Sequence, residues 1–211
     1  MDESKNVDIQ KVIEKAREFI YGEGFTEIGT KKGIKLEKKE WKDSNFAAYK
    51  GTQLEYFKGS AEEMAKELYH KPFEWWHSFD SNLLRYEKVS DISESAQIQY
   101  MLQHLPWPIS DRDFVSLFCF SHFESFSIVI WQSVEHPDFP DPASSSIVRG
   151  ITTFGGFLFE KDPSRPSSHC RIIRFMHVDP KGSIPNWLVS STVDSELVDM
   201  VLAVQTLAPG Q

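Results

Sequence analysis

The sequence predicts an α+β fold with an amphipathic helix near the start of the chain, a mostly antiparallel sheet, and a long helix near the end of the chain. Residues 8–21 carry apolar side chains at helical spacing, and Gly22 and Gly24 then end the pattern. From 83 to 178 the chain consists of short runs rich in Phe, Ile and Val, separated by Pro, Ser, Asp and Gly. A last segment, 185–207, has Pro at its first position and neither Gly nor Pro after it, which predicts a long helix.

Length and composition fit one domain spanning residues 1–211. The chain is 40% hydrophobic and 13% aromatic, and chains of this length commonly share one core. No run of 18 apolar residues occurs, and the first ten residues lack the features of a signal peptide. Cys119 and Cys170 lie in apolar contexts, which is typical of free thiols in a reducing compartment. We therefore expect a soluble, cytoplasmic protein, and the end of the chain soon after the last helix is compatible with a stand-alone domain.

The charge balance argues against nucleic acid as a partner. The chain has 31 acidic and 23 basic residues, a net charge of −8 and a pI of about 5.4, whereas phosphate backbones attract basic surfaces. One lysine run interrupts this pattern, and we interpret it as a solvated strand face, with contact to an anionic membrane as the alternative. It consists of Lys31, Lys32, Lys35, Lys38 and Lys39.

Between the first helix and residue 83 the pattern predicts two or three strands followed by two short helices. Residues 33–57 alternate partly between apolar and polar side chains. Ser60 and Glu63 form a capping box for a helix over 61–70, and a second short helix follows over 72–80.

The runs that follow predict a mostly antiparallel sheet, since each is short and bounded by turn residues. A loop rich in proline, Glu135–Ile147, interrupts them as an exposed excursion. The predicted strands are approximately 83–89, 96–105, 113–121, 126–134, 147–160 and 169–178.

The C-terminal segment is unusually apolar around its circumference. Val198 and Leu202 lie outside the main apolar face, and only Asp199 is polar between Leu197 and Val204. A helix that is apolar on most sides is normally buried. The two interpretations are a fully buried core helix, or a helix gripped by a curved sheet that lines a cavity and can meet a membrane.

Three segments of the chain carry a resemblance to a known family. They are Pro106–Val115, Ile147–Gly150 with Gly155 and Gly156 after it, and Val178–Val189. In order and spacing they resemble the signature of the START family, the steroidogenic acute regulatory protein-related lipid transfer domains. The resemblance covers roughly residues 8–207 and looks nearest to the phosphatidylcholine and ceramide transfer branch.

This resemblance implies a helix-grip fold of the START and Bet v 1 type, in which a curved antiparallel sheet wraps the C-terminal helix and encloses an apolar cavity. It implies a monomeric carrier that binds one lipid and moves it between membranes, with transient membrane contact and no cofactor. A lipid-sensing module is the alternative. The helix at about 185–207 would be the lid, through Trp187, Val193, Leu197, Met200, Val201 and Val204.

The family's choline site is only partly matched. Phosphatidylcholine carriers of the family enclose the quaternary ammonium with a Trp and two Tyr, and the matching positions here are Met101, Phe114 and Thr153. One ring therefore remains for a cation–π contact. Those carriers also place a Tyr at the lipid phosphate, and Tyr69 occupies that position.

The sterol and ceramide branches are matched less well. Sterol-handling members have a buried acid and an Arg where Gln99 and Phe118 stand here. Ceramide carriers use an amide pair whose positions correspond to Met101 and Trp131. A phospholipid is therefore favoured over a sterol or a ceramide.

Arg174 adds a reason to expect a phosphate. Because side chains alternate between the two faces of a strand, Arg174 shares a face with Cys170, Ile172 and Met176 on the predicted strand 169–178. A guanidinium in an apolar cavity needs an anion, and a lipid phosphate suits it. We hypothesise that Arg174 holds a phospholipid head group with help from Tyr69 and Gln99. The alternatives are a strand one residue out of register, or pairing of Arg174 with a protein carboxylate.

No catalytic or metal-binding motif is present in the sequence. The seven histidines fall in no HExxH frame, and there is no GxSxG motif or phosphate loop. His169 and Cys170 are adjacent on a predicted strand, so their side chains point to opposite faces. We therefore expect a protein that is not an enzyme and has no metal site, with a helix-grip enzyme of the cyclase or oxygenase type as the less favoured class.

Overall fold

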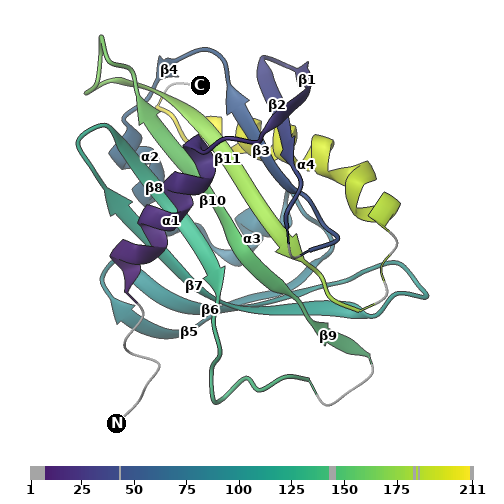
Figure 1. The fold of residues 1–211 in the computed structure, drawn as a ribbon. Helices are drawn as coiled ribbons and strands as arrows, with labels where there is room; N and C mark the ends of the chain where they lie inside the picture. Colours follow the sequence, from purple (N-terminus) through teal and green to yellow (C-terminus); the bar gives the residue numbers. More distant parts are fainter. Residues whose placement is uncertain (1–7, 43, 143–145, 183, 185, 210–211) are drawn as a thin grey trace.

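One curved sheet organises the computed structural model of the chain (Figure 1). The model describes residues 8–42, 44–142, 146–182, 184 and 186–209, with backbone only for 186–192. The strands are β1 (Thr26–Lys31), β2 (Ile34–Lys39), β3 (Ala48–Gln53), β4 (Phe57–Lys58), β5 (Leu83–Ser93), β6 (Ala96–Gln103), β7 (Asp111–His122), β8 (Phe126–Ser133), β9 (Ile147–Arg149), β10 (Ile151–Lys161) and β11 (His169–Asp179).

The sheet is antiparallel along its main path. Its strands lie in the order β1-β2-β3-β11-β10-β8-β7-β6-β5, and each neighbouring pair on this path is antiparallel. Two short strands lie off the path, with β4 antiparallel to β11 and β9 parallel to β7. The sequence prediction of a mostly antiparallel sheet is confirmed.

Helices cover both faces of the sheet. Figure 1 shows α1 (Ile9–Tyr21) in front of β8 and β10, on what we call the outer face, and the other helices behind the sheet, on the inner face. The inner-face helices are α2 (Ala61–Tyr69), α3 (Phe73–His77) and α4 (Asn186–Gln205).

The outer face is closed by α1 through the apolar side chains that the helical period predicts. Val12, Ile13, Ala16, Phe19 and Ile20 are all buried. Phe19 stacks on the ring of Phe154 at a centroid distance of 5.4 Å. The side chain of Asp8 caps the helix by accepting from the backbone N–H of Lys11, at 3.1 Å.

The inner face packs around α4. Among the described residues of this helix, Val193, Leu197, Val198, Val201 and Val204 are buried in one cluster with side chains of α2 and of the central strands. Because Val198 is buried together with the main face, α4 is enclosed on more than one side, as its broad apolar surface predicts. No helix in the described part of the chain has the length and apolar character needed to cross a bilayer.

The end of α4 and the beginning of the sheet differ from the sequence prediction. The helix ends at Gln205 rather than 207, because the N–H of Leu207 bonds to the carbonyl of Val204 and tightens the last turn. The strand β1 was not predicted, since its side chains are nearly all exposed and polar. It turns into β2 at Lys32 and Gly33, which both have positive φ, 49° and 74°.

The predicted strand 147–160 is wrong in one respect, because the structure divides it at Gly150. There the backbone N–H bonds to the carbonyl of Asp113 at 2.9 Å, and the ring of Phe114 lies where a Cβ of Gly150 would be. The first part, β9, therefore pairs with β7. The second part, β10, pairs with β8 on one side and with β11 on the other.

The close approach of strands at Gly156 gives a testable consequence. A Cβ there would lie 2.5 Å from the carbonyl oxygen of Val129 and 2.6 Å from the ring of Phe175. We expect Gly156→Ala to lower the free energy of unfolding by about 1–3 kcal/mol, because the backbone oxygen cannot move aside. Urea unfolding measures this change. Gly51→Ala, whose Cβ would meet only side chains at 3.4 Å or more, is the control and should change stability little.

Candidate functional site

Arg174 lies buried on the inner face of the sheet. Its strand β11 places Cys170, Ile172 and Met176 in the inner-face core, so the face predicted for Arg174 is the one it occupies. The Cζ atom of Arg174 lies 5.0 Å from the ring centroid of Trp131 and 5.0 Å from that of Phe157. Both contacts have cation–π geometry.

The guanidinium is partnered by a carboxylate from α4. Nη2 of Arg174 lies 3.1 Å from Oε1 of Glu196, and Nη1 donates to the carbonyls of Phe175, at 2.6 Å, and Gly156, at 3.3 Å. Pairing with a protein carboxylate, one of the alternatives left open by the sequence, is thus what the structure contains. Burial lowers the pKa of Arg174, and Glu196 opposes that shift.

An aromatic cluster extends along the inner face from Arg174. Phe118 stacks against Tyr69 at 5.3 Å and against Trp131 at 5.9 Å, and Trp131 meets Trp76 edge-on at 6.3 Å. Burial raises the pKa of the Tyr69 hydroxyl to about 12. We use the term aromatic cluster for Tyr69, Trp76, Phe118, Trp131 and Phe157.

Two N–H donors within this region are buried without a hydrogen-bond acceptor among the described residues. They are Nε of Arg174 and Nε1 of Trp76, and both side chains contact Trp131. An unpaired buried donor costs about 1–3 kcal/mol, so both positions favour a ligand that brings acceptor oxygens.

Other residues singled out from the sequence lie further from Arg174. Gln99 is buried on β6, where its side chain bonds to the hydroxyl of Tyr86. Met101 and Phe114 face each other across β6 and β7, and Phe114 is four residues, about 13 Å, from Phe118 along its strand.

Thr153 is turned away from the inner-face site. The register of β10 shifts between Thr152 and Phe154, and the Thr153 hydroxyl lies 2.8 Å from Nδ1 of His177. The ring of His177 stacks on Trp41, which packs with the outer-face core. Burial lowers the pKa of His177, so the pair serves as a neutral hydrogen bond within the scaffold.

The residues expected on the lid lie along α4 as follows. Val193, Leu197, Val201 and Val204 are buried in the inner-face core, and Met200 packs against it partly exposed. The helix α4 approaches β3 closely at Gly51, where an added Cβ would lie 3.5 Å from that of Leu197. The side chain of Trp187 lies outside the described residues.

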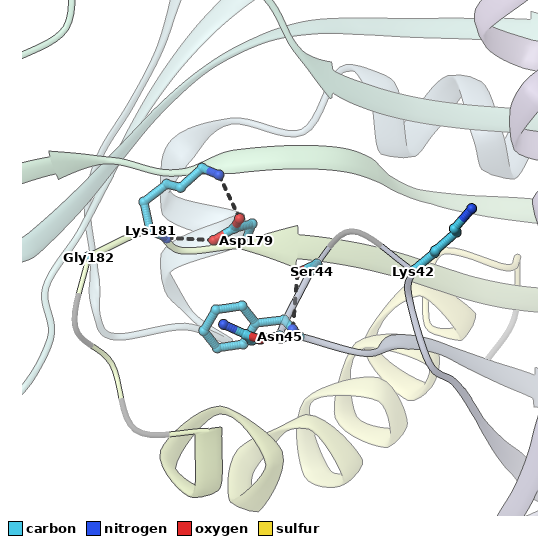
Figure 2. Close-up of a pocket in the computed structure, with 7 residues that line it drawn as sticks. Lys42, Ser44, Asn45, Asp179, Lys181 and Gly182 are labelled. Atoms are coloured by element: carbon cyan, nitrogen blue, oxygen red, sulfur yellow. Dashed lines mark hydrogen bonds and ion pairs between the residues drawn. The ribbon is translucent and has the colours of Figure 1, made fainter.

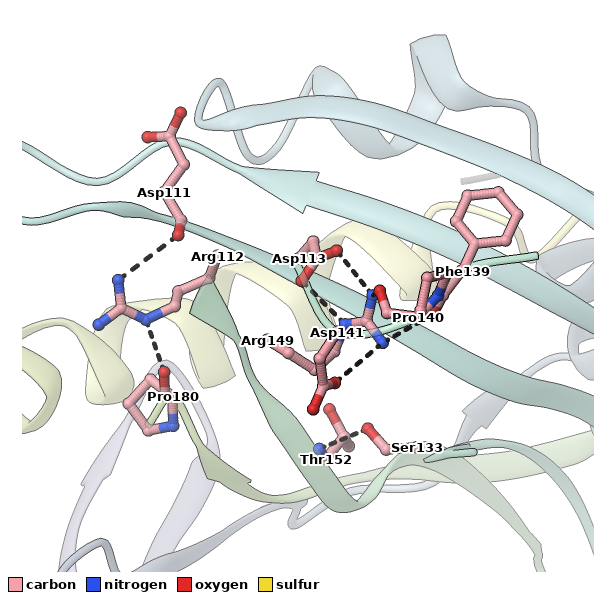
Figure 3. A network of polar contacts seen from close by, with 10 residues as sticks. All are labelled: Asp111, Arg112, Asp113, Ser133, Phe139, Pro140, Asp141, Arg149, Thr152 and Pro180. Carbon is pink, nitrogen blue, oxygen red and sulfur yellow. Dashed lines mark hydrogen bonds and ion pairs between the residues drawn. The ribbon is translucent and has the colours of Figure 1, made fainter. Parts of the chain in front are cut away.

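The charged signature residues hold the segments next to α4 in place (Figure 3). Arg112 donates through Nε to the carbonyl of Pro180, at 2.5 Å, and through Nη2 to that of Lys181, at 2.9 Å. Arg149 forms a bidentate pair with Asp113, at 2.8 and 2.9 Å. These contacts are architectural: those of Arg112 hold Pro180 and Lys181 to the start of β7, and the Arg149–Asp113 pair holds β9 to β7.

A polar hollow opens on the surface beside the same turn (Figure 2). Nζ of Lys181 pairs with Asp179 at 2.7 Å, and Figure 2 shows Lys42 pointing away from them. This hollow contains none of the predicted site residues, and its charged groups make it unsuited to acyl chains. It is lined by Lys42, Ser44, Asn45, Phe46, Asp179, Lys181 and Gly182.

Sequence reasoning did not identify Glu196 or Trp76 as site residues. Glu196 lies three residues after Val193 and four before Met200, a spacing that places it beside the apolar face of α4. That spacing was a usable signal. For Trp76 the sequence gave only an aromatic pair in a short helix, and its neighbour Trp131 comes from a distant strand.

A curved antiparallel sheet packed around its C-terminal helix defines a helix-grip protein. The family model of the START domain matches residues 39–206. The chain belongs to the START domain family, as the three signature segments predict.

Two curated relatives are the START domain-containing protein 10 of Mus musculus and of Homo sapiens. Each is 29% identical over 119 residues, which are 56% of this chain and 39% of the relative. The match thus spans well under half of each relative's length.

Solved structures show the same fold. Human STARD10 superposes with a TM-score of 0.73 at 22% identity, covering 94% of this chain and 80% of that one. The human StAR-related lipid transfer protein 5 gives a TM-score of 0.75 at 22% identity, covering 94% and 93%. Lipid binding and transfer are accordingly the activities of the family to which this chain belongs.

Proposed function

We propose that this protein binds one phospholipid molecule between the inner face of the sheet and α4, and carries it between membranes without altering it chemically. The observation that carries the proposal is the buried guanidinium of Arg174, whose Nε has no acceptor in the described part of the chain. A phosphate accepts from Nε and Nη together, which is the bidentate geometry that makes such pairs strong.

The surroundings of Arg174 suit the rest of a phospholipid. Leu36, Ile172, Val193 and Val201 provide apolar surface on the sheet and on α4. Each acyl methylene that leaves water for such a surface gains about 0.8 kcal/mol. The free Nε1–H of Trp76 provides a second donor for a phosphate or ester oxygen.

Replacing Arg174 tests the head-group contact. We expect Arg174→Met to lower phospholipid uptake roughly 10- to 100-fold, because a hydrogen bond to a charged group contributes about 1.5–3 kcal/mol. Uptake is measured as transfer of pyrene-labelled lipid between vesicles.

Arg171→Met is the matched control, since Arg171 is on the same strand but pairs with Glu160 on the outer face. Unchanged uptake by Arg174→Met, with the protein folded, would refute the proposed contact. Lipid that binds without passing to acceptor vesicles would instead indicate a sensor.

We propose α4 as the lid of this site. It covers the inner face, and the turn before it is held to β7 through Arg112, so that end of the helix has a fixed support. The buried face of α4 is apolar enough to exchange the sheet for a membrane surface.

A reversible cross-link tests the lid. The Cβ separation of 3.5 Å at Gly51 and Leu197 falls within disulfide geometry. We expect the double variant Gly51→Cys/Leu197→Cys to transfer lipid slowly when oxidised and to recover on reduction, because the bond holds α4 against β3. The two single variants are controls, and equal transfer in both redox states would contradict the lid role.

We propose that the loop between β6 and β7 makes the transient membrane contact. Trp107 in this loop is 91% exposed. A Trp side chain is enriched at membrane–water interfaces because its ring is apolar and its N–H is polar, so an exposed Trp suits contact with a membrane. Arg112, five residues further along the chain, bonds to Pro180 in the turn before α4.

Vesicle binding tests this contact. We expect Trp107→Ala to weaken co-sedimentation with phospholipid vesicles about tenfold, since it removes one large apolar side chain from the interface. Leu54→Ala removes an exposed apolar side chain elsewhere and should leave binding unchanged. Equal binding by the two variants would exclude Trp107 as the contact.

We further propose a cytoplasmic monomer. Cys119 and Cys170 are buried free thiols, and burial raises the pKa of each to about 12, which suits a reducing compartment. Within the described part of the chain, the exposed apolar side chains Ile28, Leu84 and Trp107 come from three separate segments, and this separation supports a monomer.

A further inference from the structure

The acidic partner of Arg174 gives the inner site a composition that bears on the choice of head group. Arg174 belongs to β11 and Glu196 to α4, so the two charges face each other from opposite walls of the site. We infer that this pair selects zwitterionic phospholipids with a protonated amine head group, of the phosphoethanolamine kind. In this complex, which rests on the proposed function, Arg174 binds the phosphate and Glu196 binds the ammonium.

Charge balance supports this choice over an anionic lipid. Arg174 and Glu196 are together neutral, and so is a phosphoethanolamine head group. When the zwitterion replaces the internal pair, each protein charge keeps an opposite charge beside it. A head group with only a phosphate would take Arg174 and leave the Glu196 carboxylate without a cation and next to a second anion, which repels it.

The two partners differ in how firmly they are held. The Arg174 side chain is 6% exposed, bonds to two backbone carbonyls and lies against two rings. The Glu196 side chain is 41% exposed. Arg174 is therefore the fixed group, and Glu196 is the group that can turn aside to admit a head group.

The other acidic side chains described on α4 are directed elsewhere. Asp194 pairs with Lys31 at 2.9 Å, and Asp199 lies 3.8 Å from Lys32. Both carboxylates therefore interact with lysines at the end of β1 rather than with Arg174. Within the described part of α4, Glu196 is thus the carboxylate placed to meet a ligand at Arg174.

A choline head group fits this arrangement less well. Its quaternary nitrogen has no N–H to donate to Glu196, whereas a primary ammonium has three. Two rings of the aromatic cluster, Trp131 and Phe157, already lie against the guanidinium of Arg174.

Head-group methylation tests the inference on the unmodified protein. Transfer is measured with the full chain and acyl-labelled pyrene lipids, so that the amine stays free, for phosphatidylethanolamine, its dimethyl derivative, phosphatidylcholine and phosphatidic acid. We expect uptake to fall with each methylation step, by about tenfold from phosphatidylethanolamine to phosphatidylcholine, because the hydrogen bonds from the ammonium to the Glu196 carboxylate are lost. A flat series would overturn the inference.

Glu196→Gln then tests the residue itself. It should bring the ratio of phosphatidylethanolamine to phosphatidylcholine uptake close to one and raise phosphatidic acid uptake several-fold, because Arg174 loses its internal anion. Asp199→Asn is the matched control, with the same charge change on the same helix, and should behave as the unmodified protein.

The outcomes separate the two proposals. If Glu196→Gln keeps the original ratio while Arg174→Met lowers uptake of every phospholipid, head-group selection by Glu196 is wrong and phospholipid carriage stands. If the unmodified protein takes up no phospholipid, the proposed function fails, and the inference fails with it.

Discussion

The burial of α4 against the inner face of the sheet is the constraint on which the rest of the structure depends. Leu197 and Val201 are fully buried, and Gly51 lets the helix approach β3 closely. The contacts are apolar and therefore non-directional, so they stabilise α4 without fixing a unique position for it. This is the combination that a helix needs if it is to leave the sheet and return to it.

The Arg174–Glu196 pair adds direction to that apolar interface. A buried guanidinium is costly without an anion, and Glu196 supplies one from α4. Among the described residues Nε of Arg174 has no acceptor, so Glu196 does not satisfy the whole guanidinium. The pair thus joins α4 to β11 while leaving capacity for a stronger acceptor.

The sequence predicted most of what depends on local period and less of what depends on distant contacts. Period two placed Arg174 on the inner face, because side-chain direction along a strand is a local property. The contact with Glu196 depends on how α4 lies on β11, which no local pattern encodes. The break at Gly150 likewise depends on the Phe114 ring from another strand, and the turning of Thr153 toward His177 on a register shift in β10.

In the proposed complex, the side chains that bind the ligand are the same ones that join α4 to β11. A head group that takes Arg174 removes the polar contact that Glu196 makes with β11, while Arg112 continues to hold the turn before the helix. Differential contacts of this kind are what allow a ligand to shift a conformational equilibrium. A zwitterion restores a link between the two walls through its own charges, so the loaded protein can close again. An anionic head group provides no such link, and selectivity and closure therefore have one physical origin.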